Sequence, residues 1–204
     1  RLLVVISAPF GLGENQVLNT GREEERILEA TAAARKKGEI QIEFTANGSL
    51  RALETALRDF DPHILHFTGH GVFDQAADSG FLLMEDARGQ SVPVRNADFA
   101  ALLERRAHAL RLVFLSACQS AVVPSVDGFA DLGARLTGRG IPAVLAMQFS
   151  VLHRSATEFA SAFYRASVQG DPLDAALTEG RGHMLATSLN QVDFGTPVLY
   201  LSDP

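Results

Sequence analysis

The sequence predicts an α/β domain built on a mainly parallel β-sheet, and three observations support this fold class. Short apolar, β-rich runs alternate along the chain with longer segments of helical pattern, which is the order of βαβ units. The first run, residues 2–6, shows no polar alternation, as expected of a strand buried on both faces. At 204 residues, of which 47% are apolar and 21% charged, the chain is long enough for one sizeable globular domain.

The expected elements follow in a regular order along the chain. After the first strand we expect a helix over residues 22–37, because Thr20 and Glu23 have the spacing of a capping box and Gly38 stands where a helix would end. The first turn of this helix is acidic and its last turn is basic, which agrees with the helix dipole. We expect no further role for the acids at residues 23–25.

The remaining strands and helices repeat this alternation. Further strands are expected at residues 40–45, 62–67, 111–116, 141–146 and 197–201. Further helices are expected at residues 50–59, 96–106, 152–168 and 173–187. Between the third and fourth strands, residues 81–85 and 91–94 are expected to form a small hairpin around Arg88 and Gly89. The main sheet should therefore hold about six strands, with a small inserted hairpin.

The chain as a whole excludes several classes of protein. No repeat or linker divides it, so we expect residues 1–204 to form a single domain. Because it starts at Arg1, without a methionine and directly on a strand, we expect it to be excised from a longer multidomain protein. A net charge of −6 without a basic cluster argues against direct contact with nucleic acid. No apolar run approaches the ~20 residues that cross a membrane, so no membrane partner is expected.

A nucleotide site is a rival interpretation, because Gly11-Leu12-Gly13 follow the first strand where a dinucleotide fingerprint would begin. The third glycine is missing, since Gln16 takes its place, and no acid closes the second strand. There is no Walker lysine either. The single cysteine, Cys118, rules out an intrachain disulfide and argues against a cysteine-based metal site. We therefore expect neither a metal nor an organic cofactor.

Two segments at the ends of neighbouring strands carry the candidate chemistry. In open α/β sheets, functional residues gather just past the carboxyl ends of the strands. His70 follows the third strand and Cys118 follows the fourth, so adjacent strands would bring them within reach of each other. The glycines beside His70 allow a sharp turn, and the N–H of Gly71 could face a developing oxyanion.

A histidine beside a cysteine suits nucleophilic catalysis. A free thiol of pKa ~8.5 is only slightly ionised at neutral pH, and a nearby imidazole can hold it as the thiolate or accept its proton. A cysteine at the end of an apolar strand is also often an inert core residue. The glycine-flanked His70 at the matching strand end favours the nucleophile over the inert residue for Cys118.

The other histidines and the nearby acids are expected to have structural roles. His66 and His63 are expected to be hydrogen-bonded core residues. Three histidines in helical segments are expected at the surface: His108, His153 and His183. Asp74 and Asp78 could orient His70 or bind a metal, but we favour solvated loop acids.

The segments around the two candidate residues resemble the signatures of the CHAT family. They are HFTGHGVFD at residues 66–74 and VFLSACQS at residues 113–120. CHAT domains are caspase-like peptidase domains, related to caspases, metacaspases and separase. The interval of 48 residues between His70 and Cys118 is also similar to the caspase spacing. Further similar segments cover most of the chain: GIPAV at 140–144, FASAFY at 159–164, Gly170, AAL at 175–177 and PVLYL at 197–201.

The resemblance implies a three-layer α/β/α sandwich of the caspase-hemoglobinase type. It also implies a cysteine endopeptidase that hydrolyses a protein or peptide substrate through an acyl-enzyme. In that mechanism His70 is the base, Cys118 the nucleophile and the Gly71 N–H an oxyanion donor.

The resemblance further indicates where a substrate would bind. Metacaspases place an acid two residues before the nucleophile, whereas this chain has Ser116 there, and residues 7–10 at the end of the first strand are also uncharged. We therefore expect an uncharged P1 residue. The segment containing Gln148, Phe149 and Ser150 resembles the one that pairs with the substrate backbone in caspases.

CHAT domains usually stand beside repeat or sensor modules, often in bacterial signalling or defence. The resemblance implies a cytoplasmic effector switched on by regulatory domains of the same chain or complex, and a latent state would suit long loops at residues 70–79 and 118–126. The alternative is a pseudopeptidase that keeps the fold as an interaction module.

Overall fold

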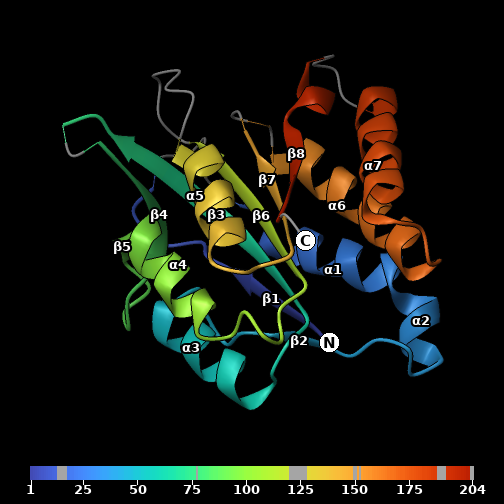
Figure 1. Ribbon diagram of the computed structural model, residues 1–204, viewed down its shortest axis with the longest axis horizontal. Helices are drawn as coiled ribbons and strands as arrows, with labels where there is room; N and C mark the ends of the chain where they lie inside the picture. Colours follow the sequence, from blue (N-terminus) through green and yellow to red (C-terminus); the bar gives the residue numbers. More distant parts are fainter. Residues whose placement is uncertain are drawn as a thin grey trace.

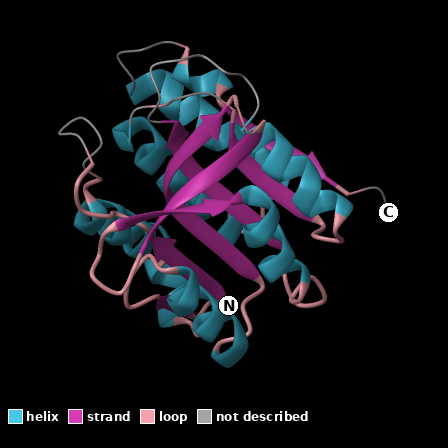
Figure 2. Cartoon of the chain, turned by 90° about the vertical axis from the view of Figure 1, so that its left-hand side faces the viewer, coloured by secondary structure: helices cyan, strands magenta, loops and turns pink. Residues whose placement is uncertain are grey.

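Helices cover both faces of a central β-sheet in the computed structural model of the chain (Figures 1 and 2). The structure describes residues 1–12, 18–76, 78–119, 128–148, 151, 153–187 and 192–202, with the backbone alone for residues 117–119 and 128–131.

The sheet has a six-stranded main path with a two-stranded branch. In spatial order the main path is β2 (Ile42–Phe44), β1 (Leu2–Ile6), β3 (Ile64–Asp74), β6 (Leu112–Gln119), β7 (Ala143–Met147) and β8 (Pro197–Leu201). The first five strands are parallel, and β8 runs antiparallel to β7. The branch consists of β4 (Ser79–Glu85) and β5 (Ser91–Arg95), which continue antiparallel from β3. The predicted mainly parallel sheet of about six strands, with a small hairpin, is confirmed.

The helices form two layers, each closing one apolar core. On one face, α3 (Leu50–Asp59), α4 (Asn96–Glu104) and α5 (Gly128–Gly138) pack against a core that includes Leu65 and Phe67 of β3. On the other face, α1 (Thr20–Ala30), α6 (His153–Val168) and α7 (Leu173–Thr187) enclose a second core around Phe114 of β6. Figure 1 shows these two groups on opposite sides of the sheet. Within the described ranges, no helix combines the length and apolar character needed to cross a membrane.

The start of the first helix differs from the prediction. Asn19, not Thr20, is the N-cap of α1, and its side-chain oxygen accepts the Arg22 N–H at 3.1 Å. The predicted capping box is therefore wrong, and the side chain of Glu23 is buried in the protein interior. The expected helix over residues 22–37 also divides in two, α1 and α2 (Ala32–Lys36), at Thr31.

The segment after the third expected strand is not a loop. β3 continues through His70 to Asp74, and β4 begins at Ser79, so the expected loop over residues 70–79 is mostly a hairpin. The second hairpin, between β4 and β5, is confirmed. Its turn uses Asp86, whose carboxylate accepts two backbone N–H groups, and Gly89, whose φ of 74° favours glycine.

Two glycines of α7 should respond in opposite directions to alanine. A Cβ at Gly180 would lie 2.5 Å from the buried ring of Phe159 on α6, whereas Gly182 has no atom within 4 Å of that position. We expect Gly180→Ala to lower the free energy of unfolding by about 1–3 kcal/mol through overpacking. We expect Gly182→Ala to raise it by up to about 1 kcal/mol, because alanine is the better helix former. Urea denaturation measures both, and equal effects would contradict the α6–α7 packing.

Candidate active site

The two candidate catalytic residues are register partners in adjacent strands. β3 pairs with β6 in parallel from Ile64↔Leu112 to Gly71↔Gln119, and in this register His70 lies opposite Cys118. Neighbouring strands are about 4.8 Å apart, and paired residues of a parallel ladder share a face of the sheet. The sheet therefore places His70 and Cys118 side by side on one face. The expectation that His70 follows the end of its strand is wrong, because β3 continues past it.

The face that holds the pair is the one covered by α1 and α6. Along β3, Leu65 and Phe67 belong to the core beneath α3 and α4. Because side chains alternate along a strand, His66, Thr68 and His70 point to the opposite face. His66 confirms this, since its ring lies 4.5 Å from that of Phe114 in the second core.

The environment of His70 is closed and tightly packed. The side chain is only 3% exposed. Beside it, a Cβ at Gly69 would lie 2.9 Å from the ring of Phe67 and 3.4 Å from the Cβ of Ser7, so glycine is needed there. Gly71, the expected oxyanion donor, is buried between β4 and β6, with Leu82 and Gln119 as register partners.

The expected substrate-binding residues are distributed around this pair. Ser116 is the register partner of Thr68 and is 2% exposed, so its side chain is closed to a substrate in this state. Gln148 follows β7, where its backbone N–H donates to the Thr196 carbonyl at 2.9 Å and its side-chain amide donates to the Tyr200 hydroxyl at 3.1 Å. Phe149 and Ser150 lie outside the described residues.

The other histidines fall into different environments. His66 is a fully buried, hydrogen-bonded residue, as predicted. His63 is hydrogen-bonded as predicted, with Nδ1 3.2 Å from the N-terminal amine, but it is exposed and not a core residue. Partial desolvation of its ring and the nearby positive charges lower its pKa. His108 is exposed as expected, whereas His153 is 19% exposed and lies close to Glu23. His183 is partly exposed and contacts the Glu158 carboxylate at 3.4 Å. Asp74 and Asp78 are exposed, in agreement with solvated acids.

Glu23 forms a buried cluster with three residues, which the sequence did not reveal. One carboxylate oxygen, Oε1, accepts the Thr68 hydroxyl proton at 2.5 Å and lies 3.1 Å from Nε2 of His66. Nε2 is also 2.8 Å from Thr68 Oγ1, and Nδ1 of His66 is 2.8 Å from the Tyr164 hydroxyl. All four side chains are almost fully buried. The expectation that Glu23 serves only the helix dipole is therefore wrong.

The hydrogen bonds show which atoms of this cluster carry a proton. A threonine hydroxyl has a single proton, and here it goes to Glu23, so the Nε2 of His66 must be a donor toward Thr68 and Glu23. Burial raises the pKa of Glu23, but the hydrogen bond and charge of His66, with His153 and Thr68, outweigh it and lower that pKa. Burial and the Glu23 charge raise the pKa of Tyr164 well above 10.0. Glu23 is thus ionised at neutral pH, and Tyr164 keeps its proton.

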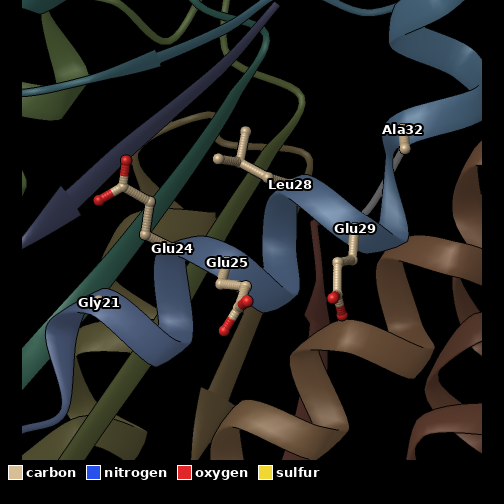
Figure 3. A pocket seen from close by; sticks show the side chains of 6 residues that line it. All are labelled: Gly21, Glu24, Glu25, Leu28, Glu29 and Ala32. Atoms are coloured by element: carbon tan, nitrogen blue, oxygen red, sulfur yellow. The ribbon is translucent and has the colours of Figure 1, made fainter.

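A separate hollow lies on the outer face of α1, away from these residues. It has a volume of about 510 Å³ and is lined by Gly21, Glu24, Glu25, Leu28, Glu29 and Ala32 (Figure 3). These positions are on the side of the helix opposite Glu23 and Ile27, which face the interior. None of the candidate catalytic residues lines it.

The family model of the CHAT domain matches residues 4–198. The chain belongs to the CHAT domain family. The CHAT domain described here accordingly has the caspase-like, peptidase-related fold of that family, and its three-layer α/β/α arrangement is the one expected.

Among solved structures, this CHAT domain is similar to a chain of the separase–securin complex of Saccharomyces cerevisiae. The two are 14% identical with a TM-score of 0.49, and the match covers 98% of this chain and 12% of that chain. No curated protein matches the sequence.

Proposed function

We propose that this CHAT domain is a cysteine endopeptidase in which Cys118 is the nucleophile and His70 the general base. The observation that carries the proposal is the register of β3 and β6, which pairs these two residues on one face of the sheet. A nucleophile and base must lie within hydrogen-bonding reach, and adjacent register partners satisfy the backbone requirement for this.

The reaction would proceed through an acyl-enzyme. The Cys118 thiolate attacks the carbonyl carbon of the scissile peptide bond, while the N–H groups of Gly71 and Cys118 stabilise the oxyanion. The imidazolium of His70 protonates the leaving amine, so the C–N bond breaks and a thioester remains. His70 then deprotonates a water molecule, which attacks the thioester. The C–S bond breaks, the carboxylic acid product leaves and the Cys118 thiol is regenerated. Ser116 and the segment from Gln148 to Ser150 would receive an uncharged P1 side chain and the substrate backbone.

We further propose that the domain is an activatable effector. The almost complete burial of His70 and Ser116 supports this, because a substrate can reach them only after a rearrangement. A regulatory sensor or repeat module in the same chain or complex would supply that change, in bacterial signalling or defence within the cytoplasm. The same burial also favours the second candidate, a pseudopeptidase that acts as an interaction module.

Alkylation of the single cysteine distinguishes the two candidates. We expect the rate at which iodoacetamide labels Cys118 to rise with pH, with a midpoint well below the pKa of ~8.5 of a free thiol, because His70 stabilises the thiolate. In His70→Ala the midpoint should return to about 8.5. The measurement is the labelling rate by mass spectrometry from pH 5 to 10. The same midpoint in both proteins, or a thiol that stays unreactive in the activated protein, would favour the pseudopeptidase.

A further inference from the structure

A buried carboxylate lies on the same face of the sheet as the proposed base. Glu23 reaches from α1 onto β3 and is 0% exposed. Burying an ionised carboxylate carries a desolvation cost that its pairing often only offsets, so such a group is weak evidence for a purely stabilising role. Perturbed buried charges are more frequent at functional sites.

The hydrogen bonds of Glu23 go to the two residues that precede His70 on its own face of β3. Oε1 binds Thr68 and His66, and His70 is the next residue in that row. Two residues along a strand span about 7 Å, so the carboxylate lies on the order of 10 Å from the imidazole of His70. Cys118 lies on the neighbouring strand, β6, as the register partner of His70.

The second oxygen of the carboxylate is less constrained. Among the described residues, Oε2 of Glu23 has no hydrogen-bond partner, and it lies 3.8 Å from Nδ1 of His153. The titratable groups around the carboxylate are His66 on β3 with Tyr164 and His153 on α6. Because Glu23 is ionised, it places a negative charge on the face of the sheet that holds His70.

We infer that Glu23 is a positioning residue that holds the β3 segment ahead of His70 and favours the protonated form of His70 through its buried charge. The inference deepens the proposed function and rests on His70 acting as the base. In a thiolate–imidazolium pair the protonated histidine both stabilises the nucleophile and donates the proton to the leaving group. A buried negative charge near His70 raises the population of this protonated form.

The expected magnitude follows from Coulomb's law. With an effective dielectric constant of about 20, a unit charge about 10 Å away shifts a titration by about one pH unit. Removing a negative charge disfavours the imidazolium, so the pH at the midpoint of the His70 titration should fall. In Glu23→Gln the amide oxygen can still accept from Thr68, so the shape is kept while the charge is lost.

The test is an NMR titration of the His70 imidazole in a Cys118→Ala background, where no thiolate titrates beside it. The His70 resonance is assigned by its loss in His70→Ala. We expect Glu23→Gln to lower the His70 midpoint by about one pH unit. Glu25→Gln, which removes the same charge from the exposed face of α1, should leave it unchanged. If Glu23→Gln does not fold, Glu23→Leu removes both the charge and its desolvation cost and should give the same shift.

Equal midpoints in the parent, Glu23→Gln and Glu25→Gln proteins would overturn the inference. Because the titration needs no turnover, the two proposals fail separately. A shifted midpoint in a protein that cleaves no peptide keeps the electrostatic effect of Glu23 on His70 but removes the peptidase. An unshifted midpoint in a protein with Cys118-dependent cleavage does the reverse.

Discussion

Cys118→Ala is expected to lower kcat/KM for peptide cleavage by at least about 10⁴-fold, because it removes the only thiol in the chain. No thioester can form without the sulfur, and no second cysteine can replace it. The β3–β6 register should survive, since alanine fits a strand and keeps the Cβ. A peptide-library cleavage assay on the intact protein measures the effect, with circular dichroism to confirm the fold.

Because Cys118 is the register partner of His70, we expect the two residues to act as one catalytic unit. Residues that act as one catalytic unit are strongly non-additive. We expect His70→Ala to cause a loss of similar size and the double variant to be no slower than either single variant. A double variant whose loss is the product of the two single losses would mean that the residues act independently, against the register argument.

Phe114→Ala is expected to lower the free energy of unfolding by about 3–5 kcal/mol. Phe114 is 0% exposed on β6 and lies at the centre of an aromatic cluster, with ring centroids 5.8 Å from Phe159, 5.7 Å from Phe163 and 6.0 Å from Tyr164. Its ring also lies 4.5 Å from that of His66. Alanine would leave a cavity between the sheet and α6 that these large rings cannot fill by small movements.

Phe10→Ala is the matched control, because it deletes the same group from a side chain that is 68% exposed. We expect it to cost less than about 1 kcal/mol in urea denaturation. If Phe114→Ala cost no more than Phe10→Ala, the second apolar core would not be packed as described.

The positions of most strands and helices along the chain could be predicted from the sequence because their signals are local. The apolar run at residues 2–6 and the Arg88-Gly89 turn of the β4–β5 hairpin appear in the structure as expected. Helix α5 was missed, because Gly128, Gly133 and Gly138 weaken its helical pattern. The continuation of β3 past His70 was also missed. The glycines around His70 suggested a turn, whereas Gly69 makes room for Phe67 and Ser7 inside the sheet.

In the candidate site too, some residues could be predicted from local sequence signals and others could not. His70 and Cys118 could be paired from the sequence, because they end similar strand signals and carry motif residues. The role of Glu23 could not be predicted, because Glu23 and His66 are 43 residues apart in the chain. The carboxylate contacts Thr68 and His66 only after α1 packs onto β3. The acidic first turn of α1 offered a sufficient local explanation for all three glutamates, and only burial separates Glu23 from its neighbours.

In the proposed mechanism, Cys118 forms a covalent acyl-enzyme with the assistance of His70. Acid quench of the intact, activated protein during peptide turnover, followed by mass spectrometry, tests it most directly. We expect the mass of the acyl fragment to be added to the peptide that contains Cys118. We expect His70→Ala to reduce this adduct strongly, and Cys118→Ala to abolish both the adduct and cleavage. Cleavage that persists in Cys118→Ala, with no adduct on the wild-type thiol, would rule out Cys118 as the nucleophile.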